Sequence, residues 1–368
     1  MSRTIVTGGA GFIGGHLVRL LVERGESVRV VERPGVAVDR LPEGVEVVFA
    51  DIRDRAALAP ALAGATRVYH LAANPNLWTL RREDFDAVNH RGAVNVLELA
   101  LEAGAGRVLH TSTESILTRS NQSGPIGPDV EISLADAIGP YCRSKLRAEN
   151  AAMAMARAGA PIVIANPTMP VGPDDPGLSP PSRLMLDFCR GRLPALMDCT
   201  LNMIDVRDVA LGLIGVMERG TPGRRYLLGG ENLTLVEFLG ILSGLTGVAV
   251  PRWTVPYPVG LAIAYASEFW ADHVDHCPPR ATVTGVRLTR RTMHFDARES
   301  LEAIGLRPRP IMQSLMDTVR GWIENRTIDP PRPDPVLFSG VGEYSGTKSH
   351  DVEENLSRIA TQSGPRAV

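Results

Sequence analysis

The sequence predicts an α/β fold, in which a doubly wound parallel sheet is joined to a smaller α/β substrate lobe. In the N-terminal half, short β-branched runs alternate with segments of helical periodicity, as is typical of a parallel sheet with helices on both faces. A glycine-rich turn directly follows the first of these runs. The chain has 368 residues, which is enough for a sizeable core and two closely associated lobes.

The N-terminal half contains the strands of the predicted parallel sheet. Strands are expected at residues 3–7, 27–32, 45–50, 67–72, 107–111 and 160–166. A helix at about 83–103 has apolar residues at helical spacing, which predicts that one face packs on the sheet. A second helix, at about 140–158, ends at Gly159 as expected for a helix C-cap.

The composition changes after Pro167, because residues 167–182 contain six prolines and therefore predict a loop that crosses to the second lobe. The first domain is predicted to span 1–170, with returning segments at about 202–230, and the substrate lobe 171–201 and 231–326. Within these segments, short strands are expected at 202–209 and 224–230, and helices at 231–250, 257–271 and 311–326. Residues 327–368 are rich in Pro, Gly, Ser and charge, which predicts a mobile C-terminal tail.

The bulk composition excludes several classes of protein. Lys and Arg total 39 against 41 for Asp and Glu, so there is no basic excess to bind nucleic acid. The four cysteines are scattered with no C-x-x-C pair, which favours reduced thiols and a cytoplasmic location. A signal peptide is not expected, because the glycine turn already begins at residue 8. The apolar run 259–271 is shorter than the ~20 residues that span a bilayer, so no integral membrane segment is expected.

The glycine turn predicts a phosphate site. Gly8, Gly11 and Gly14 have G-x-x-G-x-x-G spacing, with Phe12 and Ile13 between the last two. Gly8 permits a tight turn, Gly11 lets a pyrophosphate approach the backbone, and Gly14 lets the helix pack closely on the strand. The helix N-terminus then directs N–H groups and its dipole at the anion.

Two acidic positions indicate how an adenosine would be bound. Glu32 ends the second strand, where a carboxylate can accept both ribose hydroxyls and repel a 2′-phosphate, which favours NAD over NADP. Arg33 keeps NADP as the alternative, because an arginine can pair with that phosphate. Asp51, followed by Ile52, is placed to accept from the adenine amino group, with a helix N-cap as its alternative role.

Tyr141 and Lys145 form a Y-x-x-x-K pair near a helix start. Residues i and i+4 share a helix face, so the ammonium is expected beside the phenol and to lower its pKa. Tyr141 could then exchange a proton with a substrate hydroxyl while hydride moves. Thr111 and Thr113 lie at the carboxyl end of a strand, where Thr113 could hydrogen-bond the reacting oxygen. The alternative is that these threonine hydroxyls only hydrogen-bond the local backbone. Glu114 is either a second acid/base or substrate contact, or a solvated carboxylate.

Several strings in sequence order carry a family resemblance: TGGAGFIG, the DI pair, HLAA, Asn89 with Gly92, the Ser/Thr cluster, YCRSK and NPTMPVGP. They resemble the extended short-chain dehydrogenase/reductase family, also called the NAD-dependent epimerase/dehydratase family. LNMIDVRDVA, YLLGGENLTL and MHFDA are most similar to its hopanoid-associated sugar epimerase and dihydroflavonol reductase-like group. The resemblance covers about residues 3–326.

The resemblance implies a Rossmann domain that binds NAD(P), a small-molecule substrate and a homodimer formed through helices near Tyr141. It implies Thr113, Tyr141 and Lys145 as the catalytic trio, with candidate substrate contacts at Asn76, Glu114, Asn166, Met169 and Asn202. Beyond the turn and the acidic positions, the implied cofactor contacts are Leu71, Ala72, Ala73, Asn89, Thr111, Tyr141, Lys145, Pro167 and Thr168.

The chain departs from the family pattern in two places. Thr113 is followed by Glu114-Ser115, whereas sugar-nucleotide dehydratases and decarboxylases carry Asp-Glu or Ser-Glu there; a dehydratase is therefore disfavoured. The usual Arg-Pro of sugar-nucleotide epimerases is Asn166-Pro167 here, which weakens the case for a nucleotide-diphosphate clamp. The arginines of the second lobe are interpreted as solvated; they are Arg183, Arg190, Arg192 and Arg252.

Three further features are interpreted as structural. Residues 272–277 (DHVDHC) lack the second ligand pair of a zinc site, so no metal is expected. His70 and His110 lie in expected strands and are interpreted as core or cofactor-flanking. The apolar run 259–271 is expected to pack inside the small lobe; a wall for an apolar substrate or peripheral contact with a membrane surface is its alternative.

These observations predict an NAD(P)-dependent epimerase or oxidoreductase that acts on a secondary alcohol or ketone of a sugar, nucleotide-sugar or polyol-bearing lipid. The first alternative is a reductase or dehydrogenase of a hydrophobic ketone or aldehyde, of dihydroflavonol, sterol or terpenoid type. The second is a non-catalytic dinucleotide-binding protein, which the presence of both Tyr141 and Lys145 disfavours.

Overall fold

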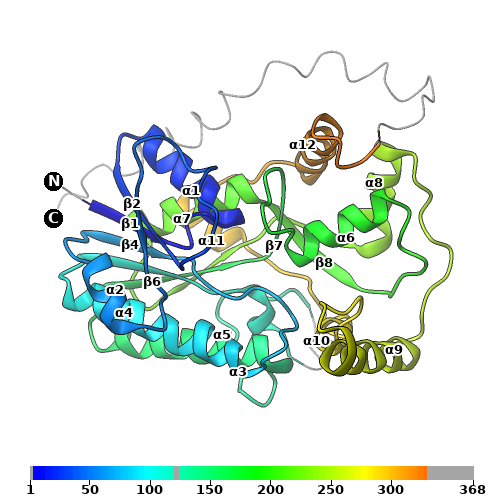
Figure 1. The fold of residues 1–368 in the computed structure, drawn as a ribbon, viewed down its shortest axis with the longest axis horizontal. Coiled ribbons are helices and arrows are strands. Elements are labelled where there is room, and N and C mark those ends of the chain that lie inside the picture. Colours follow the sequence, from blue (N-terminus) through cyan, green and yellow to red (C-terminus); the bar gives the residue numbers. More distant parts are fainter. Residues whose placement is uncertain (1–2, 120–123, 330–368) are drawn as a thin grey trace.

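A seven-stranded sheet forms the centre of the computed structural model, which describes residues 3–119 and 124–329 (Figure 1). All of its strands pair in parallel. The strand order changes direction between β1 and β4, which is where ligands bind in such sheets. In order across the sheet the strands are β3 (Glu46–Phe49), β2 (Ser27–Glu32), β1 (Arg3–Thr7), β4 (Arg67–His70), β5 (Arg107–Thr111), β6 (Ile162–Pro167) and β9 (Arg225–Leu228). The predicted doubly wound fold is confirmed.

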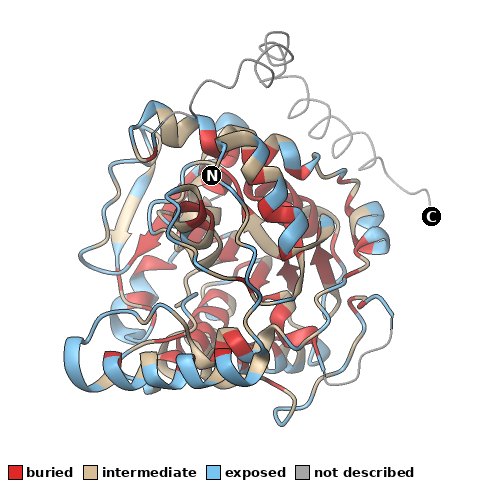
Figure 2. Ribbon diagram, turned by 90° about the vertical axis from the view of Figure 1, so that its right-hand side faces the viewer, coloured by how far each residue is buried: buried red, intermediate tan, exposed pale blue. Residues whose placement is uncertain are grey.

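Alternation along the strands explains why helices cover both faces. Ile5 and Val6 are neighbours on β1, yet they belong to different apolar clusters, because successive side chains point to opposite faces. One face is covered by α1 (Phe12–Glu23), α7 (Val206–Arg219) and α11 (Arg298–Ile304); the other is covered by α2 (Arg55–Ala61), α4 (Ala93–Glu102) and α5 (Gly139–Arg157) (Figure 1). In Figure 2 the buried residues accordingly lie on the strands and on the inner sides of the helices.

The helix expected at about 83–103 is present as three joined pieces. They are α3 (Glu83–Phe85), a π-helical segment η1 (Asp86–Gly92) and α4. A π-helical segment widens a helix locally and is frequent at functional sites. The strands expected at 45–50 and 67–72 are shorter than predicted, because only residues 46–49 and 67–70 pair with a neighbour.

A smaller mixed sheet, with one antiparallel and one parallel pair of strands, lies in the second lobe. Its strand order is β10 (Glu231–Thr234), β8 (Thr200–Asp205) and β7 (Met169–Val171). It packs with α6 (Pro180–Cys189), α8 (Leu235–Thr246) and α12 (Ile311–Glu324) around a separate apolar cluster. The remaining elements are η2 (Glu114–Leu117), α9 (Tyr257–Trp270), η3 (Ala271–Asp275) and α10 (Val283–Leu288).

The strand predicted at 202–209 is only partly confirmed, because residues 206–209 are helical. Strand β8 ends at Asp205, whose side chain accepts the Arg207 N–H at 2.7 Å and so caps helix α7. The apolar run that follows is a helix buried on nearly all sides, which lacks the polar stripe that marks a surface helix. β8 also pairs within the small sheet rather than returning to the large one, whereas β9 does return as predicted.

Three other boundaries differ from the predictions. Residues 231–234 form β10, and the helix begins only at Leu235, where Thr234 and Glu237 make a capping box. The predicted loop 167–182 contains β7 and the start of α6. The predicted tail starts too early, because Ile328 is buried in the small-lobe core; residues 330–368 lie outside the described residues. Within the described part of the chain, no helix is both long and apolar enough to cross a membrane.

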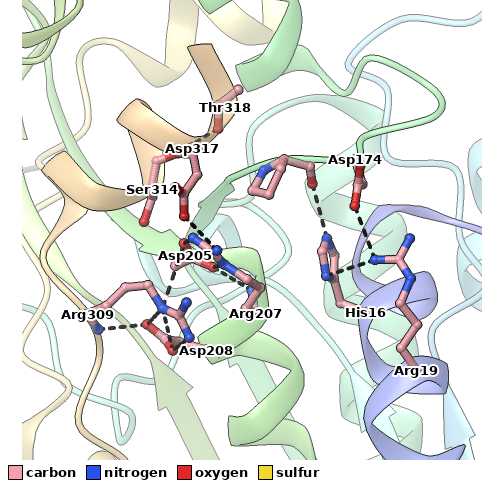
Figure 3. Close-up of polar contacts among 11 residues, drawn as sticks. His16, Arg19, Asp174, Asp205, Arg207, Asp208, Arg309, Ser314, Asp317 and Thr318 are labelled. Atoms are coloured by element: carbon pink, nitrogen blue, oxygen red, sulfur yellow. Dashed lines mark hydrogen bonds and ion pairs between the residues drawn. The ribbon is translucent and has the colours of Figure 1, made fainter. Parts of the chain in front are cut away.

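Buried ion pairs fix the second lobe to the sheet. Arg309 pairs with Asp208 at 2.9 Å, and Arg207 pairs with Asp205 at 2.6 Å and with Asp317 of α12 at 2.7 Å (Figure 3). Beside them, His16 on α1 lies 3.1 Å from the carbonyl oxygen of Pro173. The ion pairs join β8, α7 and α12, and the contact of His16 joins the loop after β7 to the helix that follows the glycine turn.

Candidate active site

The glycine turn has the close packing that a pyrophosphate site needs. Gly8 has φ of 74°, and a Cβ there would lie 2.7 Å from the backbone N of Ala72. A Cβ on Gly14 would lie 2.1 Å from the carbonyl oxygen of Gly8, so only glycine lets α1 approach the turn. Gly11 is exposed and forms the N-cap of α1 without a side-chain cap, which leaves the first N–H groups of the helix for an anion. Phe12 and Ile13 are half-buried beside it.

Glu32 is held against this turn. It is buried at the end of β2, and its Oε1 accepts the backbone N–H of Ala10 at 2.8 Å. Burial raises the pKa of Glu32, and the backbone N–H groups of Ala10 and Arg33 oppose the rise. Arg33 itself is exposed. A carboxylate fixed in this position can accept ribose hydroxyls and would repel a 2′-phosphate.

Asp51 does not cap a helix, so the alternative role considered for it is wrong. The N-cap of α2 is Asp54, whose carboxylate accepts the N–H groups of Ala56 and Ala57. Asp51 instead pairs with Arg53 at 2.7 Å, which lowers the pKa of Asp51. Ile52 is buried next to η1, where a Cβ on Gly92 would lie 2.8 Å from its Cδ1.

Asn89 joins three segments of the site. Its Oδ1 accepts the Asn74 N–H at 2.7 Å, and its Nδ2 donates to the Asn74 carbonyl at 3.1 Å and to Ser144 Oγ at 3.2 Å. Asn89 thereby connects η1 with α5 and with the segment after β4 that holds Leu71, Ala72 and Ala73, all of them half-buried.

Lys145 and Thr113 meet at the carboxyl end of β5. Lys145 is buried and donates to the Thr111 carbonyl oxygen at 2.7 Å. Burial lowers the pKa of Lys145 to about 8, and the charge of Glu149 opposes that fall. The Thr113 hydroxyl lies beside the Tyr141 phenol and donates to Glu114 Oε2 at 2.8 Å. Tyr141, Thr113 and Glu114 therefore form one cluster of polar groups.

The expectation that Lys145 lowers the pKa of Tyr141 is wrong in this structure. Burial raises the pKa of Tyr141, the charge of Glu114 raises it further, and the neighbouring Thr113 hydroxyl only partly opposes them. The ammonium of Lys145 is directed to the Thr111 carbonyl instead of the phenol. Tyr141 is consequently protonated at neutral pH and can act as a proton donor.

The groups around the turn and β5 fit a dinucleotide. The hydroxyls of Thr111 and Ser112 and Oδ1 of Asn166 are buried with no hydrogen-bond partner in the described part of the chain. Buried polar groups normally have partners, so such groups at one sheet edge indicate a polar ligand. Together with the cradle at Gly8, Gly11 and Gly14, they fit the phosphate and polar groups of a nicotinamide cofactor.

Comparison with known proteins settles the family. Residues 4–229 match the model of the NAD-dependent epimerase/dehydratase family. The chain belongs to this family. It is therefore an NAD-dependent enzyme of the extended short-chain dehydrogenase/reductase type, as the sequence motifs predict.

Three proteins illustrate the similarity. A dihydroflavonol 4-reductase-like protein from Synechocystis sp. is 35% identical over 87% of this chain and 94% of its own length. Sterol demethylase protein B from Methylococcus capsulatus is 32% identical over 88% of this chain and 98% of its own length. The structure of the dTDP-glucose 4,6-dehydratase DesIV from Streptomyces venezuelae, with NAD and TYD bound, has a TM-score of 0.72 at 25% identity and covers 88% of this chain and 98% of its own.

Some candidate contacts of the family pattern are occupied by the protein itself. Asn202 uses its amide on Gly230 and Asn232 and so connects β8 to β10. Asn76 is exposed and bonds Asn74. The Nδ2 of Asn166 donates to the Thr113 carbonyl and to Glu149. Pro167 and Thr168 are buried at the end of β6, and Met169 is half-buried.

The sequence analysis missed a buried ion pair beneath the site. Glu149 lies one turn after Lys145, is fully buried, and pairs with Arg225 of β9 at 2.5 Å. It also accepts from Asn166 at 2.7 Å. The spacing Tyr141, Lys145, Glu149 repeats every four residues, so the pattern that predicted the first two could have included the third.

The histidines lie in the core, as interpreted. His70 and His110 are buried with ring centroids 5.6 Å apart, and burial lowers the pKa of both, for His70 to about 3. In the segment 272–277, Asp272 accepts from Trp78 Nε1 at 2.9 Å and pairs with Arg82 at 3.0 Å. Over residues 3–119 and 124–329, no group of three or more His, Cys, Asp and Glu residues is placed to hold a metal.

Glu114 makes the stability of the protein pH-dependent. Burial raises its pKa from 4.5 to about 7, so the native state holds its proton more tightly than the unfolded chain. The free energy of unfolding is therefore expected to fall by up to about 3 kcal/mol as the pH rises from about 4.5 to about 7. Glu114→Gln is expected to remove this loss. Urea unfolding at about pH 5 and about pH 8 measures the difference in the free energy of unfolding between the two pH values.

The exposed Glu302 provides the matched control. Glu302→Gln is expected to leave the difference in stability between the two pH values unchanged. If Glu114→Gln leaves it unchanged as well, Glu114 does not carry the raised pKa.

Proposed function

We propose that this enzyme interconverts a secondary alcohol and a ketone on a substrate whose bulk is apolar. The observation that carries the proposal is the cluster of Tyr141, Thr113 and Glu114, at the sheet edge where the glycine turn also lies. NAD, when bound, carries the hydride. The residues assigned here are Gly8, Gly11, Gly14 and Glu32 for the cofactor and Thr113, Tyr141 and Lys145 for the chemistry.

Each side chain has a separate task in this proposal. In ketone reduction, the phenol of Tyr141 donates its proton to the carbonyl oxygen of the substrate, and Thr113 orients that phenol. Glu114 then returns a proton to Tyr141 through the hydroxyl of Thr113. In alcohol oxidation the proton moves the other way, from the substrate to Tyr141 and on to the carboxylate of Glu114. Lys145 donates to the Thr111 carbonyl oxygen and so holds the start of α5, which carries Tyr141, against the carboxyl end of β5.

The relatives support an apolar substrate over a nucleotide-sugar. Two of them are named for a flavonoid ketone and a sterol. The arginines Arg183, Arg190, Arg192 and Arg252 are exposed, and Arg190 already donates to the Thr327 carbonyl at 2.8 Å. The exposure of these arginines and the bond that Arg190 already makes do not favour a diphosphate clamp in the second lobe. The homodimer and the cytoplasmic location stay predictions.

Turnover on a matched set of substrates tests the proposal. Purified enzyme with NAD is incubated with a 3-hydroxysteroid, a terpenoid alcohol and UDP-glucose, and reduced nicotinamide and organic product are both quantified. We expect stoichiometric NADH and ketone from an apolar alcohol, and neither from Tyr141→Phe. Epimerised UDP-glucose without net NADH, together with inert apolar alcohols, would show that the enzyme is a sugar epimerase.

A further inference from the structure

Helix α9 has its large apolar side chains on the outside. Contrary to the expectation that this run packs in the small lobe, only Gly260 and Ala264 of α9 are buried. The helix and its flanks instead expose Trp253 (78%), Val259 (51%), Ile263 (52%), Tyr265 (51%), Phe269 (63%), Trp270 (57%) and Val274 (51%). In Figure 1, α9 and α10 lie at the lower edge of the molecule, away from the seven-stranded sheet.

Small residues explain this orientation. Gly260, Ala264 and Ala271 recur at helical spacing and form the side that is buried. A Cβ on Gly260 would lie 2.9 Å from Met197 Sδ, so this side of α9 contacts the small lobe closely. An ordinary surface helix buries its large apolar residues and exposes its polar ones. Here the large apolar side chains are exposed along the whole helix. A contiguous apolar surface of this kind indicates a site that binds a membrane or another molecule.

We propose that this face is a docking surface for an anionic lipid bilayer. Tryptophan and tyrosine side chains beside aliphatic ones are typical of helices that lie in the membrane interface. Arginines border the face: Arg287 donates to the Tyr265 hydroxyl at 2.7 Å, and Arg290 lies 4.9 Å above the Tyr257 ring. Both arginines are exposed, as are Arg252 and Arg280 nearby in the sequence.

Two of the three acidic groups of this segment, Glu268 and Asp272, are turned to the protein side, where they share one arginine. Glu268 pairs with Arg82 at 3.3 Å and accepts the Val283 N–H at 2.8 Å. Asp272 pairs with Arg82 as well. Asp275 is exposed, with Oδ1 accepting the Cys277 N–H. The border of the apolar face therefore presents arginine to a membrane surface, which is complementary to anionic headgroups.

A second copy of the chain fits this face less well. A helix of 14 residues is about 21 Å long and about 10 Å wide, so it offers roughly 200 Å² of contact. A stable protein interface buries about 800 Å² on each partner. In a two-fold interface over a single helix, the bordering arginines would also face their own copies.

The surface is connected to the catalytic centre on two sides. Asp272, directly after α9, bonds Trp78 and Arg82 in the segment that follows β4. Thr284 of α10 lies against the start of α5, where a Cβ on Gly139 would lie 2.3 Å from its Oγ1. Under the proposed function, a bilayer docked at α9 would deliver an apolar substrate close to Tyr141. The docking itself does not depend on that function.

Flotation of the full chain with vesicles tests the proposal. Vesicles of phosphatidylcholine alone are compared with vesicles of phosphatidylcholine and phosphatidylglycerol. We expect the protein to float with the anionic vesicles, and to float less as salt is added. The double variant Phe269→Ser/Trp270→Ser is expected to bind at least about tenfold more weakly. Phe49→Ser, at an equally exposed apolar position on β3, is the matched control and is expected to float like the wild type.

Thermal stabilisation by NAD is measured for each variant, and equal stabilisation shows that the fold and the cofactor site are intact. If the wild type does not float with either vesicle, or if Phe49→Ser weakens flotation as much as the double variant, the proposal is wrong. It is also wrong if the wild type is a dimer that the double variant converts to a monomer, because the face then binds a second copy. None of these results depends on turnover, so a failed substrate test leaves this inference standing.

Discussion

Tyr141→Phe is expected to lower kcat/KM by at least about 10³-fold while NAD still binds. The variant removes only the hydroxyl that exchanges a proton with the substrate oxygen. The ring contact with Phe85, 6.3 Å between centroids, is kept, so the fold should not change. Steady-state kinetics on the substrate found by turnover measures kcat/KM, and calorimetric titration measures the affinity for NAD.

Thr113→Ala provides the comparison for this prediction. It removes the hydroxyl that joins Tyr141 to Glu114 but leaves the phenol in place, so a smaller loss is expected. If Tyr141→Phe retains more than about a tenth of the wild-type kcat/KM, the assignment of the proton to Tyr141 is wrong.

Glu149→Ala is expected to destabilise the protein by about 3 to 5 kcal/mol. Glu149 is fully buried, and its partner Arg225 is only 12% exposed. Removal of the carboxylate leaves the guanidinium buried without its partner, although the carbonyl oxygens of Pro128 and Val130 still accept from it. Urea unfolding gives the change in free energy.

The double variant Glu149→Leu/Arg225→Met separates the ion pair from the packing. It removes both charges and keeps the volume, so we expect it to recover most of the stability that Glu149→Ala loses. A double variant as unstable as Glu149→Ala would show that the loss comes from packing instead of the unpaired charge. Loss of less than about 1 kcal/mol in Glu149→Ala would contradict the account directly.

Local signals in the sequence were enough to predict the large sheet and part of the site. The strand at 3–7, the glycine turn and the helix after it occupy about twenty residues, and their chemistry is set within that stretch. Tyr141 and Lys145 are likewise one turn apart on one helix. A pattern confined to one element can be recognised without knowledge of the rest of the fold.

Contacts between distant residues could not be predicted in the same way. Arg225 is 76 residues from Glu149 along the chain, and nothing near either residue indicates the other. The small sheet likewise pairs β7, β8 and β10, whose partner residues are 28 to 34 positions apart along the chain. The boundary at Asp205 was missed because a helix buried on all sides has no polar stripe.

The direction of α9 illustrates a further limit. Its sequence is apolar on most sides, which is equally compatible with burial in a core and with a face that contacts lipid. Only the placement of Gly260 and Ala264 against the small lobe shows that the large side chains point outward. The expected effect of Lys145 on Tyr141 failed for a similar reason, because the burial of a phenol and its distance from a carboxylate depend on the folded chain.

Identification of the nucleotide that the protein carries tests the central claim most directly. Protein purified without added cofactor is denatured, the released nucleotide is identified and counted, and any empty protein is tested for thermal stabilisation by NAD and by NADP. We predict that NAD is released, or that NAD stabilises the empty protein more strongly than NADP, because the carboxylate of Glu32 is held beside the glycine turn. Stabilisation by NADP alone would contradict the role assigned to Glu32. Empty protein that responds to neither nucleotide would contradict the proposed enzyme itself.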